Sequence, residues 1–214
     1  MMDKLKIDIV SDVVCPWCTI GYKRLEKAIS ELGIEDQVEI EWHPFELNPN
    51  MPKEGQNITE HITEKYGSTP EQQEESQQRM TAIGEEVGFT FDYFEDMRIV
   101  NTFKAHILLD YAKEFNKQTN LKMRLTTAFF SERKDVSDSD ILKQALLDVG
   151  LNAEEGLARL DTEEARSATR NKQEYWKNLG VNSVPTIVFN KKSAVTGAQP
   201  VDTFKQVLSE FIAE

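Results

Sequence analysis

The chain has two cysteines, and both lie in the segment CPWC, at Cys15 and Cys18. The preceding segment, LKIDIV, alternates apolar and polar residues, as a strand does. After Cys15 the apolar residues follow the three-to-four spacing of a helix, which Gly33 closes. The pair therefore stands where a strand passes into a helix. It is a metal clip, a structural disulfide or a redox-active dithiol.

The first two interpretations explain the pair poorly. A structural zinc site needs four ligands, and the cysteines supply two. The histidines, His43, His61 and His106, are scattered and show no paired spacing. A structural disulfide here would close a loop of only a few residues and would restrict the unfolded chain little. We expect no metal ion at the two sulfurs.

The position of the pair favours the redox interpretation. Cys15 lies near the start of the predicted helix, with Pro16 in its first turn. Unpaired backbone N–H groups and the positive end of the helix dipole favour an anion there. Thiols in such places have pKa values of about 3.5–7.5, against about 8.5 for a free thiol. Cys15 is thus predicted to attack a disulfide, and Cys18, one turn deeper and less exposed, to resolve the mixed disulfide.

Composition excludes several partners. Lys and Arg total 25 and Asp and Glu total 37, a net charge of -12, which argues against nucleic acid or an anionic membrane as the main partner. No segment approaches the roughly 18 apolar residues of a membrane helix. The opening MMDKLKIDIVSD is too acidic, and its apolar part too short, for a signal peptide. We expect a cytoplasmic protein, where CxxC indicates metal binding or catalysis.

The order of patterns predicts an α/β protein. A second strand is predicted in VEIEWHPFEL, residues 56 to 180 have entirely helical patterns, and VPTIVFN and SAVTG are predicted strands before a last amphipathic helix. The β-α-β and β-β-α parts, residues 1–55 and 165–214, are predicted to share one mixed sheet, because neither has enough strands alone. Residues 56–164 are the predicted inserted helical domain. Helix starts are expected at Asn57, Thr69 and Ser137, and helix ends at Gly67, Gly88, Gly150 and Gly180.

Four segments together resemble one family. They are SDVVCPWCTIG, HPFELNPNMP, NTFKAHILLDYAK and GVNSVPTIVFNKKSAVTGAQP, and they span nearly the full length. The chain resembles the DsbA-family thiol oxidoreductases of the thioredoxin superfamily, in their cytoplasmic FrnE-like branch. The resemblance implies a thioredoxin fold with a helical domain inserted into it. CPWC, VPT and GAQP in combination are specific, whereas CxxC alone is much weaker.

The resemblance also implies roles for residues outside CPWC. Pro185 matches the cis-proline that faces CxxC in the superfamily, where it would hold the Val184 backbone extended for a substrate peptide. It also implies that the helix of NTFKAHILL faces the active-site cleft. His106 would then bind substrate or stabilise the thiolate, with Asn101 beside it. A packed or solvated helical histidine is the more common case.

The remaining candidates have two interpretations each. Asp12 is a proton relay to Cys18 or the cap of a turn. Trp17, with Pro16, contacts substrate or merely starts the helix, and we expect Trp17 to be exposed. The loop TGAQP, residues 196–200, holds a carboxylate such as that of glutathione or holds no ligand. We interpret His43 as structural, and Met80, Met97 and Met123 as core rather than peptide-binding residues.

Three functions remain open. The first is a cytoplasmic dithiol–disulfide oxidoreductase, an isomerase included, that acts on protein or small-molecule disulfides without a dissociable cofactor. The second is a glutathione-dependent transferase or isomerase. The chain resembles the kappa-class glutathione transferases and the 2-hydroxychromene-2-carboxylate isomerases in plan, but a serine usually replaces Cys15 in them. The third is a non-enzymatic adaptor or chaperone.

The resemblance also bears on partners. Some members of the FrnE-like branch have a further cysteine pair near the C-terminus, which this chain lacks. Glutathione, a thioredoxin-type partner or a small oxidant must then recycle the site. We expect a monomer or a weak dimer.

Overall fold

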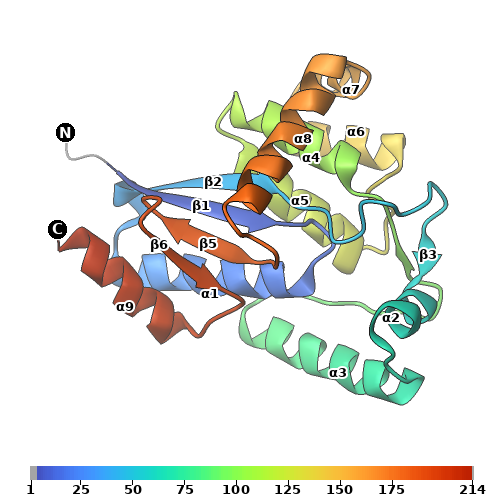
Figure 1. The fold of residues 1–214 in the computed structure, drawn as a ribbon, viewed down its shortest axis with the longest axis horizontal. Coiled ribbons are helices and arrows are strands. Elements are labelled where there is room, and N and C mark those ends of the chain that lie inside the picture. Colours follow the sequence, from blue (N-terminus) through green and yellow to red (C-terminus); the bar gives the residue numbers. More distant parts are fainter. Residues whose placement is uncertain (1–3, 214) are drawn as a thin grey trace.

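A computed structural model describes residues 4–213 and has a four-stranded mixed sheet at its centre, in the order β2-β1-β5-β6 (Figure 1). Strand β1 (Leu5–Ser11) runs parallel to β2 (Val38–Pro44). Strand β5 (Thr186–Phe189) is antiparallel to β1, and β6 (Ser193–Thr196) is antiparallel to β5. The two ends of the sequence thus form one sheet, as predicted.

Two helices cover one face of this sheet. Helix α1 (Pro16–Leu32), followed by a short 3-10 turn (Glu35–Gln37), connects β1 to β2. Helix α9 (Val201–Ile212) packs beside α1 (Figure 1). Leu25 of α1 and Phe204 of α9 lie in one buried apolar cluster with Ile9 of β1. Helix α1 ends at Gly33, whose φ of 64° is in the left-handed region that glycine adopts readily.

The middle of the chain is mostly helical. It consists of α2 (Ile58–Tyr66), α3 (Pro70–Glu86), α4 (Phe103–Lys113), α5 (Gln118–Phe130), α6 (Ser139–Asp148), α7 (Ala153–Arg159) and α8 (Glu163–Asn178). The prediction of entirely helical structure from 56 to 180 is wrong in two places. Strands β3 (Gln56–Asn57) and β4 (Arg98–Ile99) form a small antiparallel sheet. The chain between α3 and α4 is otherwise irregular, and its Phe89 and Phe91 side chains are buried in the core.

Two predicted helix starts are confirmed and one is wrong. The Asn57 side chain caps α2, and Thr69 forms a capping box with Gln72 at the start of α3. The cap of α6 is Asp138 rather than Ser137, because Asp138 Oδ1 accepts the N–H groups of residues 140 and 141. The backbone and hydroxyl of Ser137 bind Asp135 instead.

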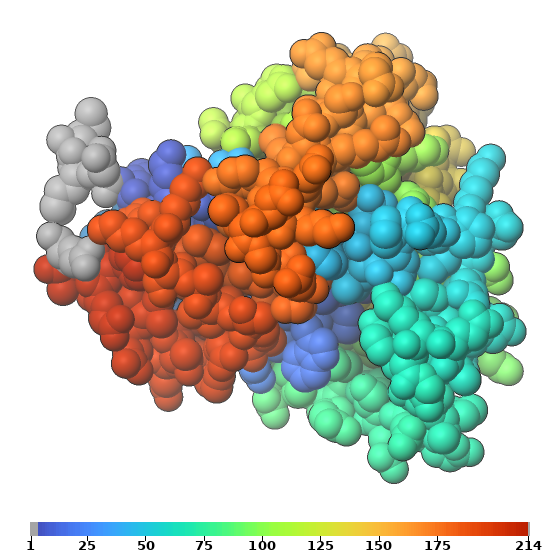
Figure 2. Space-filling model, viewed as in Figure 1, coloured from blue at the N-terminus to red at the C-terminus, as the bar shows by residue number. Residues whose placement is uncertain are grey.

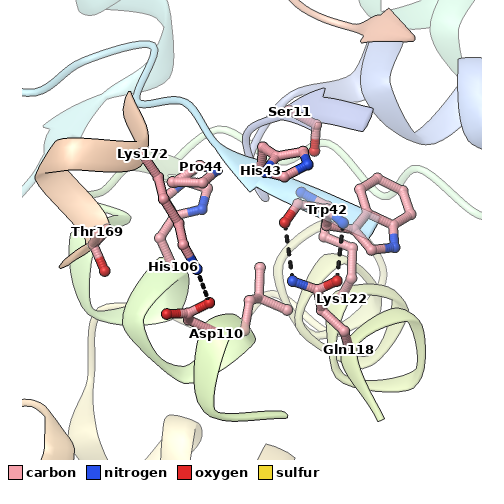
Figure 3. Close-up of a pocket in the computed structure, with 11 residues that line it drawn as sticks. Ser11, Trp42, His43, Pro44, His106, Asp110, Gln118, Lys122, Thr169 and Lys172 are labelled. Atoms are coloured by element: carbon pink, nitrogen blue, oxygen red, sulfur yellow. Dashed lines mark hydrogen bonds and ion pairs between the residues drawn. The ribbon is translucent and has the colours of Figure 1, made fainter. Parts of the chain in front are cut away.

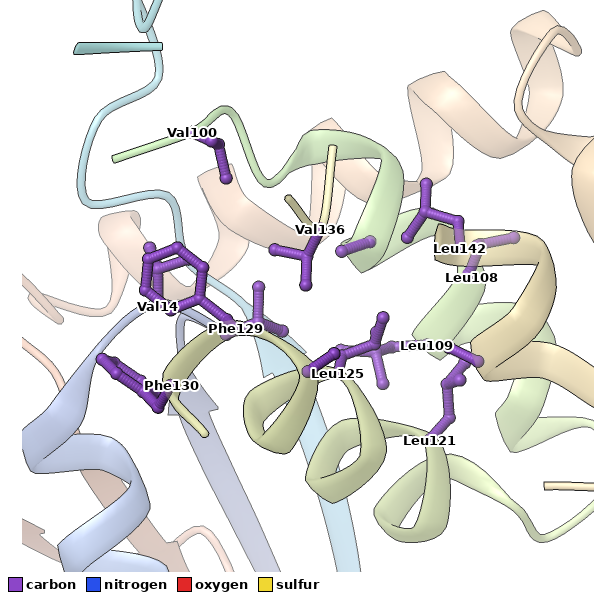
Figure 4. Close-up of a cluster of buried hydrophobic side chains, with 14 of the residues drawn as sticks. Val14, Val100, Leu108, Leu109, Leu121, Leu125, Phe129, Phe130, Val136 and Leu142 are labelled. Atoms are coloured by element: carbon purple, nitrogen blue, oxygen red, sulfur yellow. The ribbon is translucent and has the colours of Figure 1, made fainter. Parts of the chain in front are cut away.

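The helical block has a core of its own that extends to the cysteines. Leu108, Leu121, Leu125 and Leu142 are fully buried where α4, α5 and α6 meet (Figure 4). The same cluster includes Val14, which directly precedes Cys15. The loop that carries the cysteines is therefore packed on the helical block as well as on the sheet.

A side chain of the helical block also covers the edge of the sheet. The edge strand β2 turns the backbone of Trp42 toward α5, where Gln118 binds both of its polar groups (Figure 3). Gln118 Oε1 accepts the Trp42 N–H at 2.9 Å, and Nε2 donates to the Trp42 carbonyl at 2.9 Å. At Trp42 the amide thus does what a neighbouring strand would do. Across residues 4–213, no helix combines the length and apolar character that crossing a membrane demands.

Candidate active site

Cys15 is the N-cap residue of α1. Its backbone is extended (φ -101°, ψ 109°), and its Sγ accepts the backbone N–H of Cys18 at 3.2 Å. Pro16 occupies the first turn, where a missing N–H costs nothing. The structure thus places a hydrogen-bond donor and the positive end of α1 at this sulfur. Cys15 is 4% exposed and Cys18 1%, so Cys18 is the deeper of the two, as predicted.

Cys15 lines a pocket of about 400 Å³, which we call the Cys15 pocket. Pro16, Trp17 and Val184 line the same pocket, and Trp17 is 40% exposed. Cys18 is not among the lining residues. A ligand in the pocket therefore meets Cys15 and three of the predicted substrate-binding residues, while Cys18 stays behind them.

Pro185 packs directly against α1. The Val184–Pro185 peptide bond is cis, as the resemblance implies. A Cβ on Gly21 would lie 3.1 Å from Cγ of Pro185 and 3.4 Å from Cα of Ala198. A glycine at position 21 therefore lets α1 approach the segment that carries Pro185. The Pro185 carbonyl accepts the N–H of Gly197 at 2.8 Å.

Cys18 lies in surroundings that hold its proton. Burial raises the pKa of the Cys18 thiol, and the hydrogen bond and charge of Cys15 raise it further. The charge of Lys122 and the backbone N–H of Asp12 act in the opposite direction. The two sulfurs of one motif therefore have different environments.

The Asp12 carboxylate is fully engaged. Its Oδ1 accepts the Val13 N–H at 2.8 Å, its Oδ2 accepts the Leu47 N–H at 2.8 Å, and His106 Nε2 lies 3.2 Å from Oδ1. Burial acts to raise the pKa of Asp12, but the hydrogen bond and charge of His106, with Leu47 and Lys122, hold it below its usual value. The carboxylate fastens the loop before Cys15 and is a weak base, which disfavours the predicted proton relay.

His106 and Asn101 do not line the Cys15 pocket. His106 is 3% exposed, and its Nε2 faces both Asp12 Oδ1 and the Phe45 carbonyl, 3.0 Å away. Because both partners are acceptors, Nε2 carries the proton. Asn101 Oδ1 accepts the N–H of Phe103 at the start of α4. The predicted substrate contacts of these two residues therefore do not fit their positions: His106 faces the interior, and the Asn101 side chain is bound to the backbone at the start of α4.

Lys122 is a charged residue that sequence reasoning missed. It is 3% exposed, and among residues 4–213 its Nζ finds no hydrogen-bond partner (Figure 3). It lies 5.2 Å from the centre of the Trp42 ring and borders a small cavity of about 10 Å³, room for about one water molecule. Burial lowers the pKa of Lys122, while the charges of Cys18, Asp12 and Cys15 oppose this. Its position in LKMRL, among apolar residues of a predicted core helix, was the available signal.

Tyr93 and Met80 are among the residues of the Cys15 pocket that the sequence analysis did not assign to a ligand site. Tyr93, from the irregular segment before α4, lines it, and burial followed by the charge of Cys15 raises the pKa of its hydroxyl. Met80 is buried, as predicted, but it also lines the pocket, so its interpretation as core alone is incomplete. Met97 is buried and Met123 partly buried, and neither lines it.

Two other predicted features lie outside this pocket. His43 Nε2 binds Asp8 Oδ1 at 2.7 Å, and with Glu41 they place potential metal ligands within 4.8 Å of one another, although Lys113 pairs with Glu41. The loop 196–200 has its N–H groups at Gly197 and Gln199 bound within the protein. None of these residues lines the Cys15 pocket.

The fold and the site define a class of protein. A mixed sheet, a CxxC pair at the start of α1 and a cis-proline packed on that helix characterise a thioredoxin-fold protein with a redox-type motif. The model of the DSBA-like thioredoxin domain matches residues 6–209. The chain therefore belongs to the DSBA-like thioredoxin domain family.

Relatives and solved structures agree with this assignment. The chain is 27% identical over 205 residues to the Bacillus subtilis protein YwbO, described as uncharacterized, with 95% of this chain and 96% of YwbO covered. It is similar to a probable DsbA oxidoreductase from Streptomyces coelicolor (TM-score 0.91, 31% identity, 98% of this chain and 91% of that one). The cytosolic disulfide reductase DsbM from Pseudomonas aeruginosa, a structure with GSH, shares the fold (TM-score 0.69, 17% identity, 98% and 100% covered).

Proposed function

We propose that this protein is a dithiol–disulfide oxidoreductase in which Cys15 attacks and Cys18 resolves. The observation that carries the proposal is the difference between the two sulfurs. Cys15 lines the pocket and accepts an N–H bond at the start of α1, whereas Cys18 lies behind it with its pKa raised by burial. A sulfur that lines the pocket beside a helix-start N–H and a deeper sulfur held as a thiol match the attacking and the resolving role.

The proposed reaction has two exchanges. The Cys15 thiolate attacks one sulfur of a disulfide, a Cys15–substrate bond forms, and the second substrate sulfur leaves as a thiolate. The Cys18 thiolate then attacks Cys15 Sγ, the Cys15–Cys18 bond forms, and the substrate leaves as its second thiol. The protein dithiol is oxidised by two electrons and the substrate disulfide is reduced. The reverse direction donates the disulfide.

Resolution requires that Cys18 lose its proton, and Lys122 is the residue proposed to assist. Its ammonium favours the Cys18 thiolate by charge, which is the direction in which it acts on the Cys18 pKa. The buried Nζ has no hydrogen-bond partner among the described residues, so its charge acts at a distance, on Cys18, Asp12 and Cys15. Asp12 and His106 are proposed to hold the loop, not to carry the proton.

Two cysteine variants test the assignment of roles. The proposal predicts that Cys18→Ser accumulates a mixed disulfide with substrate, because Cys15 still attacks and nothing resolves it. Cys15→Ser should accumulate none and lose exchange activity by several orders of magnitude. Mass spectrometry after acid quenching gives the adducts. A mixed disulfide on Cys18 in the Cys15→Ser protein, at the wild-type rate, would reverse the two roles.

The redox equilibrium tests the reaction class. In glutathione buffers followed by tryptophan fluorescence, a single two-electron transition between Cys15–Cys18 dithiol and disulfide is expected. Potentials of such couples run from about -120 to -270 mV, and the value determines whether the protein donates or accepts disulfides. Glutathione binding without any intramolecular disulfide would favour the glutathione-dependent transferase or isomerase. A cellular role that survives loss of both cysteines would favour the adaptor.

Glutathione or a thioredoxin-type protein is the proposed recycling partner, and the cytoplasm is the proposed compartment. The description of DsbM as a cytosolic disulfide reductase with GSH supports this choice, although the likeness to DsbM concerns the fold. Cell fractionation checks the compartment. Reoxidation and reduction rates with each candidate partner check the recycling step.

A further inference from the structure

The Cys15 pocket has the size of a small-molecule site. Its volume of about 400 Å³ lies in the range of roughly 300–1,000 Å³ that is typical of ligand sites. Helices α2 and α3 and the irregular segment before α4 form its walls, opposite the start of α1. In Figure 2 the teal atoms of this region flank the blue atoms of the chain's first part, beside the orange and red C-terminal part.

Much of the pocket's lining is apolar, although the buried Gln73 also lines it. The apolar part includes Ile58, Ile62, Met80, Ile99, Phe129 and Phe130. Two aromatic side chains at the pocket are exposed, Trp17 by 40% and Tyr66 by 65%. Exposed large aromatics beside an apolar cavity offer ring faces to a ligand, so an apolar, ring-sized group fits these walls best.

The charge of the lining is also distinctive. The chain has 37 Asp and Glu residues, yet none is among the described residues that line this pocket. Lys65 is the cation of the lining, and its Nζ donates to the Leu47 carbonyl and Asn48 Oδ1, which leaves one N–H available. Burial and the charge of Lys65 lower the pKa of His61, which is therefore neutral at pH 7. A ligand with a positive charge would find no carboxylate among these lining residues and would be repelled by Lys65.

We propose that the Cys15 pocket binds low-molecular-weight disulfides that have an apolar, ring-sized group and no positive charge. This inference rests on the proposed function, because the ligand's disulfide must meet Cys15. In the step itself, Cys15 Sγ bonds to the ligand sulfur that carries the bound group, and the other half leaves as a thiolate. Cys18 then displaces the bound half as a second thiolate, and the protein retains the disulfide.

The test uses the reduced wild-type protein and four disulfides. Dithiodipyridine is aromatic and neutral, dithiobis(nitrobenzoate) aromatic and anionic, bis(hydroxyethyl) disulfide aliphatic and neutral, and cystamine aliphatic and cationic. Each second-order rate is divided by that of the same disulfide with dithiothreitol, which removes intrinsic reactivity. The aromatic pair should exceed bis(hydroxyethyl) disulfide by on the order of tenfold or more, since apolar burial adds to binding. Cystamine should be slowest.

A charge reversal tests the rim of the pocket. Lys65 is exposed, so Lys65→Glu should fold, and its ratio of dithiobis(nitrobenzoate) to cystamine rates should fall on the order of tenfold at low ionic strength. Lys143→Glu is the matched control, because Lys143 is exposed on α6 and does not line the pocket. The control should keep the wild-type ratio.

The outcomes separate this inference from the proposed function. If the protein exchanges with none of the disulfides, the proposed function fails. If normalised rates are equal for all four, or if an unfolded protein disulfide reacts faster than every one of them, exchange is real but the pocket does not select small apolar ligands. If the ratio of dithiobis(nitrobenzoate) to cystamine rates fell equally in Lys65→Glu and Lys143→Glu, Lys65 would have no specific role in selecting the charge of the ligand.

Discussion

The two cysteines face opposite kinds of surroundings. On the Cys15 side lies a pocket of about 400 Å³ whose described lining has no carboxylate. Behind Cys18 lies what we call the buried polar layer, Asp12, His106 and Lys122, each at most 3% exposed. Water and ligands reach the first region, so charge there is screened and open to exchange. The second is nearly closed, so each charge in it affects the others strongly.

The comparison shows that two sulfurs at the start of one helix can have different hydrogen bonds and different burial. Helix α1 gives its N-terminal N–H group to Cys15, and the loop and α5 surround Cys18 with protein. The difference depends on the helical block, because Lys122 and His106 come from α5 and α4.

Removing the Asp12 charge should break the buried polar layer most severely. Asp12→Asn leaves an amide where two backbone N–H groups and His106 donate, so the free energy of unfolding should fall by about 2–4 kcal/mol. Because the pKa of Asp12 is lower in the folded state, its contribution is present above the unfolded value of about 3.9 and is lost as pH falls through the folded value. Urea unfolding between pH 2 and 7 measures both effects. The variant should lack this acid-side loss, and an unchanged pH profile would contradict the assignment.

Neutralising Lys122 should raise the stability of the protein but slow the resolution of the mixed disulfide by Cys18. Lys122→Met removes a buried charge without a hydrogen-bond partner, so the free energy of unfolding should rise by about 1–3 kcal/mol. Resolution by Cys18 should slow by about tenfold, because the thiolate loses a nearby cation. Denaturant unfolding and quenched-flow decay of the mixed disulfide give the two quantities. Lys143→Met, on the exposed face of α6, should change neither.

Filling the close contact between α1 and Pro185, which lies on the Cys15 side of the comparison, should change the free energy of unfolding less. Gly21→Ala places a Cβ 3.1 Å from the Pro185 ring, and the crowding should exceed the gain in helix propensity, for a net loss of about 1 kcal/mol. Ser30→Ala, at an exposed site of the same helix, should not destabilise the protein. Thermal unfolding of both variants measures the difference. If Gly21→Ala is instead more stable than the wild type, the segment that carries Pro185 moves enough to accommodate the added methyl group.

The smallest effect on stability is expected at Trp17. Because this side chain is 40% exposed, Trp17→Ala should change the free energy of unfolding by less than about 1 kcal/mol. Its exchange rate with an aromatic disulfide should fall a few-fold, since one wall of the pocket is lost. Comparing aromatic and aliphatic disulfides separates lost contact from a changed thiolate. If the rates with aromatic and aliphatic disulfides fall equally, the loss of Trp17 has changed the reactivity of Cys15 itself.

Local sequence signals were enough to predict the elements that depend on chemistry between near neighbours. Alternation in LKIDIV, the three-to-four spacing after Cys15 and Gly33 fixed β1 and α1, and with them the place of both sulfurs at a helix start. Those signals are readable because strand period, helix period and caps act over a few residues. The cis peptide at Pro185 followed only from the family resemblance.

Tertiary structure alone decided what surrounds the sulfurs. Lys122 and His106 stand in ordinary apolar patterns of two different helices, and no local signal indicates that both lie near Asp12. Nor does local pattern bring α2, α3 and Tyr93 to the opposite side of Cys15. Burial and charge in these regions arise from packing between segments far apart in the chain. That packing, rather than any local preference, gives the two cysteines their different chemistry.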